Sequence, residues 1–294
     1  MKHFQIFAAV AALSLLAACS IKEDRTDCSL TAPVSVHVND FALSLEDFPT
    51  KTTQTAAAYS GVKALTLAFY QGASEAYKET QIKGTLEDDE TFGEFSLSLP
   101  MGSYTMVVIG HGLNDGEPAV TLTGPSSASF GDYPARETFA CTEGVNINSS
   151  SAIDIGVTLE RIVTKLQVAS SDARVEGAVS VRMTFAAGGK AFSPASGLAL
   201  SDSGFSNTVG ISSAVGATSL SNSYLFLSSD DQDIDVTLET LDADGNTLFS
   251  KTITGVPFQR NRVTILTGAM YTNSGIGGSF QLNTDWLAGR NLSF

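Results

Sequence analysis

The chain has 294 residues, with 17 Lys and Arg against 31 Asp and Glu, and its formal net charge at pH 7 is −14. Nucleic-acid binding depends on clustered Lys and Arg that neutralise phosphates, and the sequence holds no such cluster, so this balance excludes a nucleic-acid-binding protein. It also excludes electrostatic attraction to anionic lipid, so any membrane attachment has to come from acyl chains.

Residues 1–18 have the pattern of a lipoprotein signal peptide. Lys2 supplies a positive start, the stretch from Phe4 to Ala18 is almost wholly apolar, and Cys19 follows the small residues directly. Small residues before the cut suit a signal peptidase, and the thiol of Cys19 is the group that takes the lipid. The apolar run is shorter than the roughly 20 residues of a membrane-spanning helix. We therefore expect an exported chain that begins at an acylated Cys19.

Residues 19–30 read as a short tether. Ser20 to Arg25 is charged and partly acidic, and it resembles the export signal of Bacteroidetes lipoproteins that reach the cell surface. A solvated linker between lipid and first domain is the simpler interpretation, and the two interpretations are compatible.

The rest of the chain alternates apolar and polar residues with period two, the pattern of strands that have one buried face. Turn signals separate these segments, among them Asn114-Asp115-Gly116 and Asp244-Gly245-Asn246. No amphipathic helix of more than about three turns is evident. The sequence predicts an all-β fold of β-sandwiches, with strands that include Val34–Val38, Leu65–Phe69, Phe95–Leu99, Val181–Phe185 and Ile234–Glu239.

A chain of this length most naturally forms two domains. Ala152–Leu159 reads as the closing strand of the first half and Ile162–Val168 as the opening strand of the second. We predict an N-terminal β-sandwich over residues 31–158 and a C-terminal β-sandwich over residues 159–294. The Ser- and Gly-rich region Ser193–Asn222 is expected to be a long surface loop or a partly ordered excursion.

Two cysteines remain once Cys19 is acylated. Cys28 and Cys141 can pair in an oxidising compartment, or they can be two separate buried thiols. The sequence leaves this open because it does not show how close the two α-carbons come.

Catalytic and metal-binding patterns are missing from the sequence. His37 lies on the polar face of a predicted strand and His111 follows a buried-looking one, so both are expected to be structural or solvated. The acidic run Asp230–Asp235 favours a solvated loop over a calcium site, and Asp242–Asn246 favours a hairpin turn. We expect no enzyme activity, no metal and no cofactor.

Three motifs carry a resemblance to a known family. They are the residues around Glu23–Cys28, the segment Leu159–Leu166, and Val256–Thr264 with the later Asp285-Trp286. Together they resemble the Bacteroidetes fimbrillin superfamily, and in particular FimB-type fimbrial anchoring subunits. The matches lie in patches from end to end of the chain.

The resemblance implies two transthyretin-like β-sandwich domains and a structural role in surface fimbriae, with other fimbrial subunits as partners. In polymerising subunits a protease, commonly cutting after arginine, removes the first strand, and a strand of the next subunit fills its groove. Here no arginine lies between Arg25 and Arg136, although Lys51 lies in a plausible loop. We therefore favour a base or anchoring subunit that keeps its first strand and its lipid at the outer membrane.

Several alternatives stay open. The chain can be a polymerising or tip subunit of the same structure, with or without a host or bacterial surface ligand. A role of another class is a surface glycan-binding lipoprotein, although one Trp and scattered Tyr residues suggest no sugar platform. Phe280, Leu282 and Trp286 share one face of a predicted terminal strand, which is either a core strand of its own domain or a donor strand for a neighbour.

Overall fold

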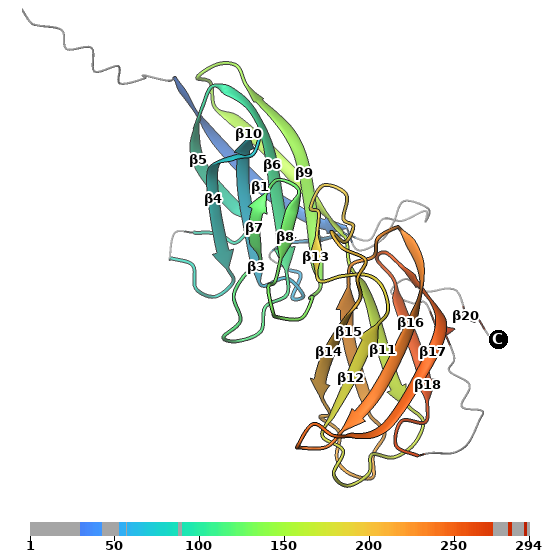
Figure 1. Cartoon of the computed structure of the whole chain (residues 1–294). Coiled ribbons are helices and arrows are strands. Elements are labelled where there is room, and N and C mark those ends of the chain that lie inside the picture. The colour runs from blue at the N-terminus through green and yellow to red at the C-terminus, as the bar shows by residue number, and fades with distance from the viewer. Residues whose placement is uncertain are drawn as a thin grey trace, which may run out of the picture.

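The computed structural model describes residues 30–42, 53–56, 58–87, 90–272, 282–283 and 291–292. Every regular element within these residues is a β-strand (Figure 1). Among them no helix is long and apolar enough to cross a membrane. The predicted all-β class is therefore confirmed.

The first half contains ten strands, which precede residue 162. They are β1 (Thr31–Ala42), β2 (Thr53–Thr55), β3 (Ala64–Gln71), β4 (Ser74–Ile82), β5 (Glu94–Pro100), β6 (Gly102–His111), β7 (Thr121–Gly124), β8 (Ser127–Ser129), β9 (Thr138–Ile147) and β10 (Ile153–Arg161).

The second half contains the remaining strands. They are β11 (Thr164–Ser170), β12 (Ser180–Phe185), β13 (Ala191–Phe192), β14 (Phe205–Gly210), β15 (Leu220–Leu225), β16 (Asp231–Leu241), β17 (Thr247–Gln259), β18 (Val263–Gly268), β19 (Leu282–Asn283) and β20 (Asn291–Leu292).

The first half is a sandwich made by one sheet that folds over. Strands β9, β6, β3 and β4 form one layer, and β10, β1 and β5 form the other, with β2 beside the end of β1. The layers are joined where β10 pairs with β9 only through Glu160↔Ala140 and Arg161↔Phe139. Alternate side chains of these strands meet in one buried core between the layers, as expected for strands with period-two patterning.

The outer face of the β9–β6–β3 layer is also buried, and this explains why β3 is covered on both faces. Ala68, Val107 and Ile109 on that face meet the β7–β8 hairpin and side chains of the second half, including Phe192 and Phe226. The rings of Phe192 and Phe226 stack with centroids 4.2 Å apart. β13 pairs with β8 in the same place, so the two halves share both an apolar cluster and a small sheet (Figure 1).

The second half is a sandwich of two sheets. One has the order β15-β11-β18-β19-β20 and the other the order β14-β12-β16-β17. Their inner faces enclose a core with Phe185, Phe258 and Leu225 among its buried residues. Strand β11 is parallel to β18, and the strands of the second sheet are all antiparallel.

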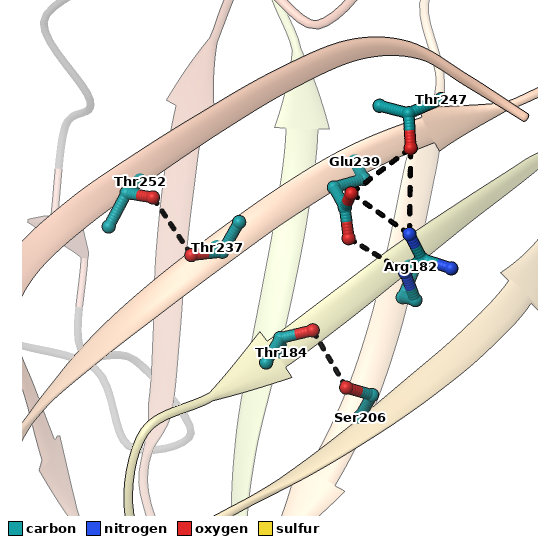
Figure 2. Close-up of polar contacts among 7 residues, drawn as sticks. All are labelled: Arg182, Thr184, Ser206, Thr237, Glu239, Thr247 and Thr252. Carbon is teal, nitrogen blue, oxygen red and sulfur yellow. Dashed lines mark hydrogen bonds and ion pairs between the residues drawn. The ribbon is translucent and has the colours of Figure 1, made fainter.

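Hydroxyl and ion pairs cover the outer face of the β14-β12-β16-β17 sheet (Figure 2). The register aligns Ser206, Thr184, Thr237 and Thr252 in one row across four strands. Within that row Thr184 bonds Ser206 at 2.7 Å and Thr237 bonds Thr252 at 2.8 Å. Such cross-strand pairs stabilise a sheet without burying apolar area, and we assign this row no other role.

The predicted strands are confirmed, with two differences at the level of elements. The region Ser193–Asn222 contains β14, which pairs with β12 along its whole length, so a long surface loop is wrong there. Phe205 stacks on Phe185 with ring centroids 5.0 Å apart, which anchors this polar strand to the core. The predicted domain boundary at 158/159 falls inside β10, which runs to Arg161.

Candidate functional site

Strand β1 lies between two neighbours along most of its 12 residues. On one side it runs parallel to β10, from Val34↔Ile153 to Ala42↔Glu160. On the other side it is antiparallel to β5 from Thr31↔Pro100 to His37↔Glu94, and then to β2. Removing this one strand would leave an open groove with an unpaired edge on each side, so β1 and its groove are the candidate site.

The inner face of β1 fills the core of the first sandwich. Val34, Val36, Val38 and Phe41 are each no more than 4% exposed. Phe41 stacks at a tilt on Phe139 with ring centroids 5.0 Å apart. Burying three valines and a phenylalanine stabilises the fold by roughly 6–12 kcal/mol on transfer values, which is an upper estimate. Strand β1 is therefore an integral core strand rather than a loosely attached arm.

The basic residue of β1 is His37, and the other titratable residue of the strand, Asp40, lies three positions further along. The Nδ1 of His37 is hydrogen-bonded to the carboxylate of Glu94 on β5, and its Nε2 lies 2.8 Å from Asp154 Oδ1 on β10. The hydrogen bond to Glu94 is the main reason that the pKa of His37 is raised above its ordinary value, and Asp154 adds to it. Gly156 lies directly opposite His37 on β10, and a Cβ atom there would collide with the side chain of Asn39.

The other histidine is structural. His111 is fully buried; its Nδ1 pairs with the carbonyl of Gly112 at 2.6 Å and its Nε2 accepts from the amide of Val120 at 3.1 Å. Burial lowers the pKa of His111 to about 4, which keeps the ring neutral. The sequence-based expectation for this residue is confirmed.

Two of the sequence motifs meet at the junction between the halves. The side chain of Arg161 is 4% exposed; it pairs with Glu137 at 2.7 Å and donates to Asn261 Oδ1 at 2.8 Å. The amide of Asn261 in turn donates to the carbonyl of Val163 at 3.1 Å. The sequence shows both motifs but not their contact, because residues 100 positions apart leave no periodic signal.

A family model matches residues 33–288, and it is described as a family of unknown function (DUF6562). The chain belongs to this family. No protein in the set of curated sequences matches it.

Solved structures share the fold of this DUF6562 protein at low sequence identity. One is a "putative adhesin" from Bacteroides ovatus, with 12% identity over 88% of this chain and 97% of that one at a TM-score of 0.51. Another is the fimbrial anchor protein Mfa2 from Porphyromonas gingivalis, with 11% identity over 87% and 97% at a TM-score of 0.50. A third, from Bacteroides thetaiotaomicron, belongs to "putative polysaccharide binding proteins", with 12% identity over 89% and 100% at a TM-score of 0.50.

Most of the predicted site residues of the DUF6562 protein lie outside the described residues: Cys19, Cys28, Lys51, Phe280 and Trp286. Lys51 falls in the sequence between the end of β1 and the start of β2. Leu282 lies in β19, whose neighbour Asn283 pairs with Ile265 of β18. The backbone of this part of the terminal segment thus lies in a sheet of its own chain, between β18 and β20.

Cys141 lies on β9 and has no disulfide bond to a described residue. Burial raises the pKa of its thiol to about 12, and the nearby Glu143 adds to the effect. The thiolate form is therefore scarce at neutral pH, which makes Cys141 a poor nucleophile.

The predicted solvated loop at Asp230–Asp235 is wrong, because Asp231 begins β16 and the run continues as a strand. Asp242 accepts from the amides of Asp244 and Asn246 and so closes the β16–β17 hairpin, which confirms the predicted turn. Asp230 pairs with Arg260 at 2.9 Å. Over the described part of the chain, no group of three or more His, Cys, Asp or Glu side chains could hold a metal ion.

Proposed function

We propose that this protein is a structural subunit of cell-surface fimbriae that assembles through β-strand exchange. The observation that carries the proposal is the fold shared with a fimbrial anchor protein over 87% of this chain and 97% of that one. No catalytic role forms part of the proposal.

The groove that β1 fills shows the physical means of assembly. In a subunit that loses its first strand, the space between β5 and β10 would expose unpaired main-chain groups on both sides and a row of apolar pockets beneath. Main-chain hydrogen bonds then give an incoming strand its affinity, and the pockets for alternate side chains give it specificity. The segment with Phe280, Leu282 and Trp286 is the part of this chain that we propose as a donor strand for a neighbouring subunit.

Within the fimbria we assign the protein to the base, as a lipid-anchored subunit that keeps β1. Acylated Cys19 would hold the chain at the outer membrane, with two β-sandwich domains over residues 31–158 and 159–294 facing outward. Two sequence features support this assignment. Cysteine follows the signal peptide directly, and no arginine stands between Arg25 and Arg136, so an arginine-specific protease has no site between β1 and β2.

The test is mass spectrometry of the N-terminus of protein isolated from its native outer membrane. We expect the fimbria-associated form to begin at an acylated Cys19. A Cys19→Ala variant should release fimbriae into the medium, whereas Cys141→Ala, which leaves the lipid in place, should not.

Two other outcomes would change the assignment. An unacylated chain that begins at Thr52, after cleavage at Lys51, would make the protein a polymerising or tip subunit that loses β1. Acylated protein that never co-purifies with fimbriae would overturn the fimbrial role altogether.

Glycan binding is the second candidate, and a cleft at the junction favours it. The cleft holds about 340 Å³ and is lined from both halves, with Asn114, Arg136, Asn222 and Tyr224 among its residues. Amide, guanidinium and phenol groups around such a space suit a sugar. Soluble binding to a panel of polysaccharides, with Asn222→Ala as the variant, tests this candidate.

A further inference from the structure

The groove that holds β1 carries two acidic side chains on its outer rim, one from each wall. Glu94 stands on β5 and Asp154 on β10, and the ring of His37 bridges them through its two nitrogens. The remaining charged residues of β5 and β10 are Glu160 and Arg161, and Glu160 pairs with Ala42 at the far end of β1. The acidic rim is therefore confined to one position along the groove.

We propose that Glu94 and Asp154 select the strand that occupies this groove by its charge, and that the occupant must present a cationic side chain at the position of His37. This inference rests on the proposed strand exchange, applies to a form of the subunit that has released β1, and names the chemistry of the partner. The partner is an apolar–polar alternating strand with Lys, Arg or protonated His between two inward apolar residues.

Electrostatics gives the reason. A neutral or acidic side chain between the two carboxylates leaves their mutual repulsion uncompensated, whereas a cation interacts favourably with both. The side chains are partly exposed, at 32% for His37, 47% for Glu94 and 79% for Asp154, so water and salt weaken each interaction. We therefore expect a strand with a cation at this position to bind several-fold more tightly than one with a neutral residue, rather than many orders of magnitude more tightly.

The same position fixes the register of the occupant. The neighbouring outward residues of β1 are Ser35 and Asn39, which are neutral, so β1 presents its cation at one place only. A slip by two residues keeps the apolar face inward but moves the cation away from the rim. Charge thus distinguishes registers that the apolar pockets alone would accept.

The terminal segment of this chain does not meet the requirement. Its inward pattern would be Phe280, Leu282, Thr284 and Trp286, and the residues between them are Gln281, Asn283 and Asp285. None of these three is a cation, and Asp285 would add a third negative charge. We infer that a second copy of this chain is a poor donor for the groove and that the partner strand comes from a different protein.

The experiment uses the full chain with a specific protease site introduced between residues 43 and 52. After cutting, β1 stays in its groove without a covalent link, and labelled peptides with the sequence Thr31–Ala42 compete for the groove. The peptides carry His37 or the substitutions His37→Lys, His37→Gln and His37→Glu, and competition is measured at pH 5.5 and pH 8.5.

We expect His37→Lys to compete about fivefold better than His37→Gln at both pH values, as two partly exposed ion pairs would give. The His37 peptide should match His37→Lys at pH 5.5 and fall toward His37→Gln at pH 8.5. His37→Glu and a peptide of residues 279–287 should compete worst. In a Glu94→Gln/Asp154→Asn receptor these differences should vanish.

The failures of the two proposals are distinguishable. Equal competition by all peptides would overturn the charge selection and leave strand exchange intact. If no peptide displaces β1, strand exchange into this groove fails. In that event the thermal midpoints of intact His37→Lys and His37→Glu chains at pH 8.5 decide the charge effect on its own, and equal midpoints would overturn it.

Discussion

Asn261 holds a backbone conformation that few residues other than glycine adopt, with a φ of 59°. It is 1% exposed, and its side chain accepts the hydrogen bond from Arg161. Asparagine tolerates this left-handed region because its short polar side chain bonds locally, whereas most other residues are strained there by about 1–2 kcal/mol. One residue therefore meets a conformational requirement and a polar one at the junction.

Two substitutions separate these requirements. Asn261→Gly keeps the backbone conformation and removes the acceptor, so we expect the free energy of unfolding to fall by about 2 kcal/mol. Asn261→Ala also introduces the strain, so it should cost about 1 kcal/mol more. Urea denaturation measures both losses of unfolding free energy, provided that the variants keep the same dependence of that free energy on urea concentration. Equal losses for the two variants would mean that the left-handed backbone conformation is not a reason for asparagine at position 261.

Substitutions on the two faces of strand β1 test its period-two alternation of buried and outward residues. Val36 points into the core at 0% exposure, and Ser35 beside it faces outward. Val36→Thr buries a hydroxyl without a partner and should lower the free energy of unfolding by about 2 kcal/mol. Ser35→Thr also introduces a threonine, but on the outward face, and it should change the free energy of unfolding by no more than about 0.5 kcal/mol. Thermal and urea unfolding of both variants checks this, and similar effects would contradict the period-two reading of β1.

The alternation of apolar and polar residues predicted most strands, because successive side chains of a β-strand point to opposite faces and the sequence shows this period of two clearly. The sequence did not predict strand β14, because Phe205 and Val209 are its main apolar residues in a stretch rich in Ser, Asn and Gly. Its place is fixed by pairing with β12, which is a tertiary effect. β3 shows the reverse case, since Ala64, Thr66 and Ala68 read as an outward face and yet are buried. Small side chains there let another layer approach.

The candidate site was only partly readable from sequence. The polar face of β1 was predicted, and with it the outward place of His37. Its partners Glu94 and Asp154 come from two other strands, and their approach depends on a register that no local pattern encodes. The same holds for the contact between Arg161 and Asn261. Sequence thus gave the strand and its faces, while the ion contacts needed the fold.

At the scale of the whole molecule, the register of the first sandwich bears on the two remaining cysteines. Cys141 follows Ala140, which pairs with Glu160, and Glu160 pairs with Ala42 at the end of β1. Cys28 precedes Thr31 at the opposite end of the same strand. Eleven steps along a strand span about 36 Å, and three residues of extended chain reach back by about 10 Å at most. A disulfide needs α-carbons within about 7 Å, so the register argues against this pairing within one chain.

The prediction is that both thiols stay free. Protein with Cys19 acylated, unfolded in urea without reductant and treated with iodoacetamide, should gain two carbamidomethyl groups, on Cys28 and Cys141. In the folded protein Cys141 should react slowly, because burial holds the pKa of its thiol well above neutral. A chain that gains neither group in urea until it is reduced would establish the bond. That result would contradict the distance argument from the register of β1.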